Sequence, residues 1–274
     1  MTSFGIAEPV GSTGARLGEG PRWDAEAGRL LWVDIEGGRL HAGDRTVECG
    51  AMVGAVAPWA GGVVLAALLD ELAAVDVAEG SLRPLAAVPH GRPNMRTNDG
   101  ACDAAGRFWI GTMALDETPG AGALYRYDPD GILHTVLGEI TLSNGLGWDA
   151  RDRLMYYIDS RTQRVDVLDF DLPSGEVENR RPFAVVAEED GIPDGLAVDD
   201  EGGIWVALYG GGRVRRFDPD GTVSGEVEVP VPRATACCFA GSRLFVTVRE
   251  GLFALEVPYS GPPARPFGGT PPMP

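Results

Sequence analysis

The chain has 274 residues and a formal net charge of −17, from 40 acidic against 23 basic side chains. A surface this negative repels phosphate backbones and anionic headgroups, so we expect neither nucleic acid nor a membrane as partner. Its 44% hydrophobic and 23% charged residues are typical of a globular protein with a sizeable core, which excludes a disordered chain.

The first residues, Met1 to Pro9, carry neither the basic nor the apolar segment of a signal peptide. No apolar run approaches the ~20 residues that a membrane-spanning helix needs. The four cysteines form no C-x-x-C motif, and we expect them to be buried free thiols in a reducing compartment. They are Cys49, Cys102, Cys237 and Cys238. We therefore expect a cytoplasmic protein.

Four stretches along the chain repeat one pattern: a short strand, a turn rich in Asp and Gly, and a second strand with an aromatic residue. They are residues 19–24 with 30–34, 98–103 with 108–111, 144–149 with 154–158, and 194–199 with 204–207. Two weaker copies lie at 56–66 and 237–247. Six units at a spacing of about 40–50 residues predict the blades of a β-propeller.

The second half of each unit agrees with this prediction. Residues 122–131 and 212–221 are near-copies that both end in Asp-Pro-Asp-Gly, where Pro presets φ for a turn and Gly accepts a positive φ. Residues 169–175 form a similar turn, and no segment keeps a helical period. We predict an all-β protein, a single six-bladed β-propeller domain over residues 1–274 with an irregular tail from Ser260, and a monomer because a closed propeller is the default monomer.

The repeat also locates a candidate site. Counting back five residues from the turn aspartates at 24, 103, 149 and 199 reaches Glu19, Asn98, Asn144 and Asp194. The weak copies have Val53 and about Ala234 at the corresponding place. The first strand of a propeller blade lines the central channel, so these positions form a ring around one mouth. Any one of them could be a turn former, but four polar residues at equivalent positions favour a functional site.

Carboxylate and amide oxygens are preferred ligands of divalent cations, so the ring predicts one metal ion in the central channel. Glu19 and Asp194 supply two negative charges and Asn144 adds a neutral oxygen, which leaves positions open for water or substrate. Calcium, magnesium and manganese suit such ligands and zinc tolerates them, so the pattern leaves the metal open.

Two further features lie near Asn98. Arg96 precedes it by two residues and shares its face of the strand, where a guanidinium suits hydroxyl or carboxylate groups of a substrate. The loop at 114–121 is longer than its counterparts and carries Asp116 and Glu117, which makes it a candidate wall over the channel. No serine-hydrolase elbow, zinc-protease motif, P-loop or dinucleotide fingerprint occurs.

Several motifs in order resemble the SMP-30/gluconolactonase/LRE family of regucalcin-like sugar lactonases. They are Gly-Glu-Gly-Pro at 18–21, Arg-Thr-Asn-Asp-Gly at 96–100, Gly-Thr-Met at 111–113, Ser-Asn-Gly at 143–145 and Ile-Pro-Asp-Gly at 192–195. The resemblance runs from about Leu17 to Val248. It implies a six-bladed propeller that hydrolyses aldonolactones with a single divalent metal.

The resemblance also implies roles for individual residues. It makes Glu19, Asn144 and Asp194 the metal ligands, with Asp194 also the general base, and Arg96 and Asn98 substrate contacts. In the lid loop the chain departs from the family pattern, because Asp116 takes the nearest position to a substrate-binding Glu, or Glu117 if the register shifts by one.

We therefore expect a metal-dependent hydrolase that opens a gluconolactone-type sugar lactone to the aldonic acid, with Asp194 acting on a water. A metal-dependent organophosphate or other ester hydrolase on the same scaffold is the alternative enzyme. A calcium-binding regulatory protein without turnover is the non-enzymatic alternative. A protein-interaction platform leaves the polar ring unexplained.

Overall fold

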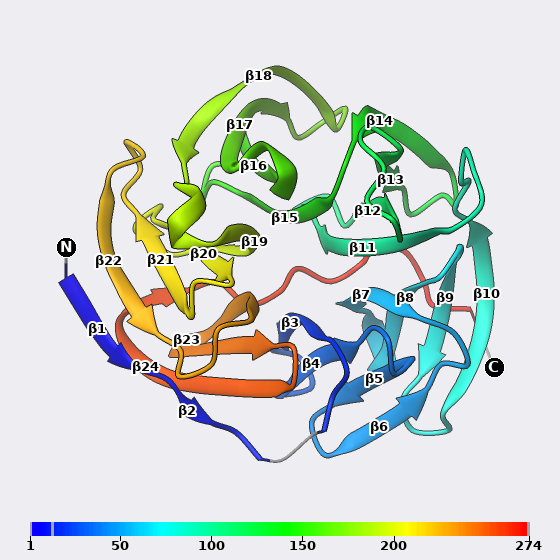
Figure 1. Cartoon of the computed structure of the whole chain (residues 1–274). Coiled ribbons are helices and arrows are strands. Elements are labelled where there is room, and N and C mark those ends of the chain that lie inside the picture. The colour runs from blue at the N-terminus through cyan, green and yellow to red at the C-terminus, as the bar shows by residue number, and fades with distance from the viewer. Residues whose placement is uncertain (1, 12–13, 273–274) are drawn as a thin grey trace.

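The computed structural model describes residues 2–11 and 14–272, so Met1, residues 12 and 13, and the last two residues of the tail lie outside it. Six sheets surround a central axis like blades, which confirms the predicted six-bladed β-propeller (Figure 1). Blade 1 contains β3 (Gly18–Asp24), β4 (Arg29–Asp34), β5 (Arg39–Ala42) and β6 (Arg45–Glu48). Blade 2 contains β7 (Val53–Pro58), β8 (Val63–Leu68), β9 (Glu71–Asp76) and β10 (Ser81–Ala87).

The next blades follow the same antiparallel order, with the first strand nearest the axis (Figure 1). Blade 3 contains β11 (Met95–Cys102), β12 (Phe108–Ala114), β13 (Gly122–Tyr127) and β14 (Leu133–Ile140). Blade 4 contains β15 (Ser143–Trp148), β16 (Leu154–Asp159), β17 (Arg164–Asp171) and β18 (Glu176–Val185). Blade 5 contains β19 (Ile192–Val198), β20 (Ile204–Tyr209), β21 (Arg213–Phe217) and β22 (Val223–Glu228).

Blade 6 is built from both ends of the chain. The long β23 (Ala234–Val248) folds back at Gly241, which has φ +65°, and Thr235 Oγ1 lies 2.9 Å from Thr247 Oγ1. It therefore supplies two strands, β24 (Gly251–Gly261) supplies the third, and β2 (Glu8–Pro9) pairs antiparallel with β24 as the fourth. β1 (Thr2–Ile6) runs parallel to β22 at the edge of blade 5. The N-terminal segment thus closes the ring.

Helical structure in residues 2–11 and 14–272 is confined to three short 3₁₀ turns. They are η1 (Ala60–Gly62), η2 (Ser160–Thr162) and η3 (Glu188–Asp190). Within these ranges no helix has the length and apolar character needed to cross a bilayer. The four cysteines are buried and free, as predicted, and burial raises the pKa of the Cys49 thiol to about 11.

The core lies between neighbouring blades. Six apolar clusters in the described part of the chain each join one blade to the next, including the closure of blade 6 on blade 1. Between blades 5 and 6, for example, the Trp205 ring packs edge-on against Phe239 at 5.5 Å. Because a close-packed apolar cluster lies between every two neighbouring blades, the ring that surrounds the axis is rigid.

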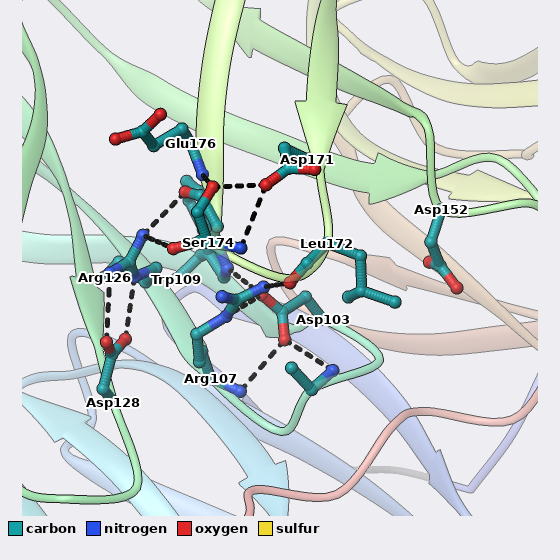
Figure 2. A network of polar contacts seen from close by, with 12 residues as sticks. Asp103, Arg107, Trp109, Arg126, Asp128, Asp152, Asp171, Leu172, Ser174 and Glu176 are labelled. Carbon is teal, nitrogen blue, oxygen red and sulfur yellow. Dashed lines mark hydrogen bonds and ion pairs between the residues drawn. The ribbon is translucent and has the colours of Figure 1, made fainter.

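The turn aspartates that define the repeat are structural. Asp103 accepts hydrogen bonds from Arg107 Nε at 2.7 Å and Trp109 Nε1 at 2.9 Å. Figure 2 shows how this cluster continues into blade 4, where Arg107 Nη2 donates to the Leu172 carbonyl at 2.7 Å. A buried carboxylate therefore fixes the turn, the aromatic residue of the second strand and the contact with the next blade.

Residues 262–269, here called the C-terminal strap, leave β24 and cross the end of the channel away from the predicted metal ring (Figure 1). As expected, they have no regular structure. Their N–H groups donate to carbonyls of three blades: Ala264 to Trp23, Phe267 to Pro58 and Gly268 to Gly106. A Cβ on Gly106 would lie 2.7 Å from Gly268 Cα, so this approach needs glycine. Beneath the strap remains a cavity of about 110 Å³.

Candidate active site

A cavity of about 340 Å³ opens where the first strands of the blades begin, and residues from around the whole ring line it. Its floor is polar and consists of Glu19, Asn98, Asn144 and Asp194. The structure thus brings together the four residues that the repeat singled out. All four side chains are buried, although each lines the cavity.

Local backbone geometry explains why these side chains converge. The strand register shifts beside each floor residue, between Glu19 and Arg22, Thr97 and Gly100, Ser143 and Leu146, and Pro193 and Leu196. Such irregularities interrupt the alternation of a strand and re-aim side chains, which is why they are frequent next to active sites. In blades 2 and 6 the first strands begin with Val53 and Ala234, both fully buried apolar residues.

A chain of hydrogen bonds fixes the two amides. Arg96 Nη1 donates to Asn98 Oδ1 at 2.5 Å, and Asn98 Nδ2 donates to Asn144 Oδ1 at 2.7 Å. Asn144 Nδ2 in turn donates to Ser160 Oγ at 2.7 Å, and Ser160 donates to the Pro193 carbonyl at 2.6 Å. These hydrogen bonds hold the Asn144 amide from both its oxygen and its nitrogen. The Oδ1 atom therefore has a fixed orientation and keeps a second lone pair for a ligand.

Arg96 is buried rather than on the surface, and burial lowers the pKa of its guanidinium. Ser160 was not found from the sequence. It lies in η2, outside the repeat-equivalent position that located the other residues.

The two carboxylates of the floor are destabilised in their charged forms unless a cation is bound. Burial, and then the charge of Asp99, raises the pKa of Glu19 to about 8, although the Gly20 N–H and the guanidinium groups of Arg96 and Arg22 oppose the rise. Burial, and then the charges of Glu19 and Asp99, raises the pKa of Asp194 well above its ordinary range. The floor therefore has a strong preference for a positively charged ligand.

Beneath the floor lies a buried ion pair that the sequence did not reveal. Arg22 Nη2 donates to Asp99 Oδ1 at 2.9 Å and to the Gly100 carbonyl at 2.8 Å. Arg22 thus compensates the charge of Asp99 outside the cavity lining. Glu19 and Asp194, in contrast, line the cavity.

The donor set fits a divalent metal. It offers only oxygen ligands, two of them carboxylates whose charged forms a bound cation would stabilise, and such ligands are the ones that hard divalent cations prefer. No group of three His, Cys, Asp or Glu side chains that could hold a metal occurs among the residues described. A metal here therefore needs the Asn144 amide oxygen beside Glu19 and Asp194.

In the lid loop the structure separates the two candidates. Glu117, which has φ 51°, lines the cavity and pairs with Arg161. Asp116 lies outside the cavity lining, where Arg92 Nη2 donates to it at 3.1 Å and Thr118 Oγ1 donates at 2.7 Å. Glu117, the alternative for a register shifted by one residue, thus lines the cavity, and Asp116 does not.

Comparisons with known proteins agree with this fold. The model of the SMP-30/gluconolactonase/LRE-like region matches residues 17–250. Regucalcin of Xenopus laevis is 37% identical over 262 residues, which cover 90% of this chain and 87% of the relative. The "Putative sugar lactone lactonase YvrE" of Bacillus subtilis is 34% identical, over 94% of this chain and 97% of the relative. The solved structure of a calcium-binding protein, regucalcin, from Agrobacterium tumefaciens has a TM-score of 0.89 at 28% identity, covering 98% of this chain and 99% of that one.

Proposed function

The chain belongs to the SMP-30/gluconolactonase/LRE-like family, and we propose that it is a metal-dependent lactonase that opens a gluconolactone-type sugar lactone to the aldonic acid. The observation that carries the proposal is the convergence of Glu19, Asn144 and Asp194 with the Arg96–Asn98 pair in one cavity. This arrangement offers both a site for a cation and hydrogen-bonding groups for hydroxyls.

Glu19, Asn144 and Asp194 hold the ion in this proposal. When bound, a divalent cation supplies Lewis acidity to a lactone carbonyl and neutralises the two carboxylates. Calcium, zinc, manganese and magnesium are all compatible with these oxygen ligands, so the metal is a question for the experiment below.

Asp194 orients a water molecule and accepts one of its protons. The water oxygen attacks the lactone carbonyl carbon, the bond from that carbon to the ring oxygen breaks, and the ring oxygen leaves as a hydroxyl group with the proton that Asp194 had accepted. The new carboxylic acid then releases its own proton to the solvent. Arg96 donates hydrogen bonds to the hydroxyls of the sugar, and Asn98 Oδ1 accepts one from them, because both N–H groups of Asn98 already serve Ser143 and Asn144. Behind the floor lies the Arg22–Asp99 pair, and the strap crosses the far end of the channel.

A calcium-binding protein without turnover is the second candidate. It is favoured by the description of the Agrobacterium structure as a calcium-binding protein and by the regucalcin relatives. The same three oxygen ligands serve both candidates, so metal binding alone does not distinguish them.

We also propose a cytoplasmic monomer that takes a small-molecule substrate and binds neither nucleic acid nor membrane. The four free buried thiols support a reducing compartment, and the net charge of −17 disfavours anionic partners.

Proton release during lactone opening tests the proposal. Chelator-treated protein is assayed on a panel of aldono-1,4- and aldono-1,5-lactones, with calcium, manganese, zinc or magnesium restored and spontaneous hydrolysis subtracted. Turnover that requires one of these metals supports the lactonase. Metal-linked stabilisation without turnover on any lactone supports the calcium-binding candidate instead.

A further inference from the structure

Two ion pairs lie on opposite sides of the cavity mouth. Arg249, in the turn between β23 and β24 of blade 6, donates from Nη2 to both carboxylate oxygens of Glu36, each at 3.0 Å. Glu36 lies in the turn between β4 and β5 of blade 1. Glu117 of blade 3 pairs with Arg161 of blade 4. In a ring of six, the boundary between blades 6 and 1 lies opposite the boundary between blades 3 and 4 (Figure 1).

The Arg249–Glu36 pair faces the cavity and remains accessible to a ligand. Both residues line the cavity, and their side chains are 30% and 40% exposed. Burial lowers the pKa of Arg96, and the charges of Glu19 and Asp194, followed by those of Glu36 and Glu117, oppose this lowering. The two rim carboxylates thus act on the same guanidinium at the cavity floor.

The backbone holds Arg249 in register with the floor. Its carbonyl accepts a hydrogen bond from Gly18 N–H at 2.9 Å, and its own N–H donates to the Arg233 carbonyl at 3.0 Å. Gly18 directly precedes Glu19, so the position of the pair is coupled to that of a floor carboxylate. A recognition group fixed in this way loses little entropy when a ligand binds.

The chemistry of the pair selects among ligands. A guanidinium has five N–H donors, of which Nη2 serves Glu36, so donors and carboxylate lone pairs lie side by side. Two adjacent hydroxyls match this arrangement, because one can donate to Glu36 while the other accepts from Arg249. An anionic substituent meets the Glu36 charge, and an alkyl chain would desolvate both groups without replacing their hydrogen bonds.

Building on the lactonase proposed above, we propose that Arg249 and Glu36 form a hydroxyl-recognition subsite that selects neutral lactones with a vicinal diol remote from the reacting carbonyl. The cavity volume of about 340 Å³ is at the lower end of the range for ligand pockets and suits a single sugar unit. The subsite lies on blades 6 and 1, across the floor from Glu117, so it contacts a different part of the substrate.

The test compares two substrates in the metal-loaded protein: a six-carbon aldono-1,4-lactone with an exocyclic diol, and unsubstituted γ-butyrolactone. Arg249→Met and Glu36→Gln are each expected to lower kcat/KM for the hydroxylated lactone by about 10–100-fold, the effect of losing hydrogen bonds to a charged group. Turnover of γ-butyrolactone should stay within about twofold. Arg39→Met is the matched control, because Arg39 pairs with Glu48 on the surface of blade 1 and does not line the cavity.

An equal loss on both substrates, or no loss on the hydroxylated one, overturns the subsite. A binding measurement keeps this outcome separate from the fate of the lactonase proposal. Titration of the wild-type protein and of Arg249→Met with a neutral alditol should show about tenfold weaker binding by the variant. If the wild-type protein opens no lactone but this difference is found, the subsite stands and the proposed activity falls; equal alditol binding overturns the subsite.

Discussion

Asn98 Nδ2 donates to Asn144 Oδ1 at 2.7 Å, and this bond joins two amides from neighbouring blades across the mouth of the channel. Asn98 is itself held by Arg96, and Asn144 by Ser160. The orientation of the Asn144 oxygen therefore depends on residues of both blades. A substitution of Asn98 should lower the affinity for the metal although it removes no metal ligand.

We expect Asn98→Ala to weaken binding of the divalent metal by about 10–100-fold, the usual cost of losing a group that orients a metal ligand. Competition with a metal-sensitive chelator measures the affinity. Asn179→Ala is the control, because Asn179 donates to Asp169 on the exposed part of blade 4 and lies outside the cavity lining. Unchanged affinity in Asn98→Ala would show that the amide chain does not orient Asn144.

Two aspartates five residues apart should give opposite results. Asp194→Ala removes a floor carboxylate and is expected to abolish turnover of the lactone while the protein stays folded. Asp199 lies at the end of the same segment and accepts hydrogen bonds from Arg216 Nε at 2.7 Å and Trp205 Nε1 at 2.8 Å. Asp199→Ala leaves a buried guanidinium with less compensation, which costs about 3–5 kcal/mol of unfolding free energy.

Lactone turnover and urea denaturation of both variants measure the two effects. The asymmetry follows from position alone, because both residues belong to the same repeat unit. Full activity in Asp194→Ala would contradict the assignment of the floor, and unaltered stability in Asp199→Ala would contradict the structural role of the turn aspartates.

The stability of the metal-free protein should depend on pH through Glu19. Its pKa is raised from an ordinary value of 4.5 to about 8, so the native state binds more protons than the unfolded state between these values. Stability then falls as the pH rises from 4.5 towards 8. Denaturation of chelator-treated protein across this range measures the trend, and Glu19→Gln should reduce it, while Asp194, whose pKa burial also raises, keeps part of it. A saturating divalent cation should oppose it, because the cation binds the ionised carboxylate.

The repeat made much of this site predictable. Glu19, Asn98, Asn144 and Asp194 occupy one position of a unit that recurs with recognisable turns, so the topology of the propeller alone brings them together. No equivalent signal marks Glu36 or Arg249, because each lies in a loop that differs from blade to blade.

The choice between Asp116 and Glu117 depended on the backbone conformation of the lid loop. Glu117 adopts φ 51°, a conformation that its residue type does not announce, and this turn sends one acidic side chain into the cavity and its neighbour towards Arg92. Ring closure was equally hidden, because β2 is a two-residue strand, Glu8–Pro9, too short to show a period.

The C-terminal strap should stabilise the ring without contributing to the chemistry. Phe267 packs between Trp59, at a ring distance of 4.9 Å, and Tyr127, at 5.4 Å, and so links blades 2 and 3 beneath the channel. We expect Phe267→Ala to lower the free energy of unfolding by about 3–5 kcal/mol, as for other buried phenylalanines. Turnover of the folded protein should change little, because the floor lies at the other end of the channel.

Urea denaturation and lactone turnover at a temperature where the variant is fully folded separate these effects. Ile132→Ala is a suitable control, because Ile132 is an exposed apolar residue in the turn that follows β13. A Phe267 variant that kept its stability but lost turnover would contradict this prediction and show that the strap acts on the site. Its hydrogen bonds to blades 1, 2 and 3 would then connect the strap to the site.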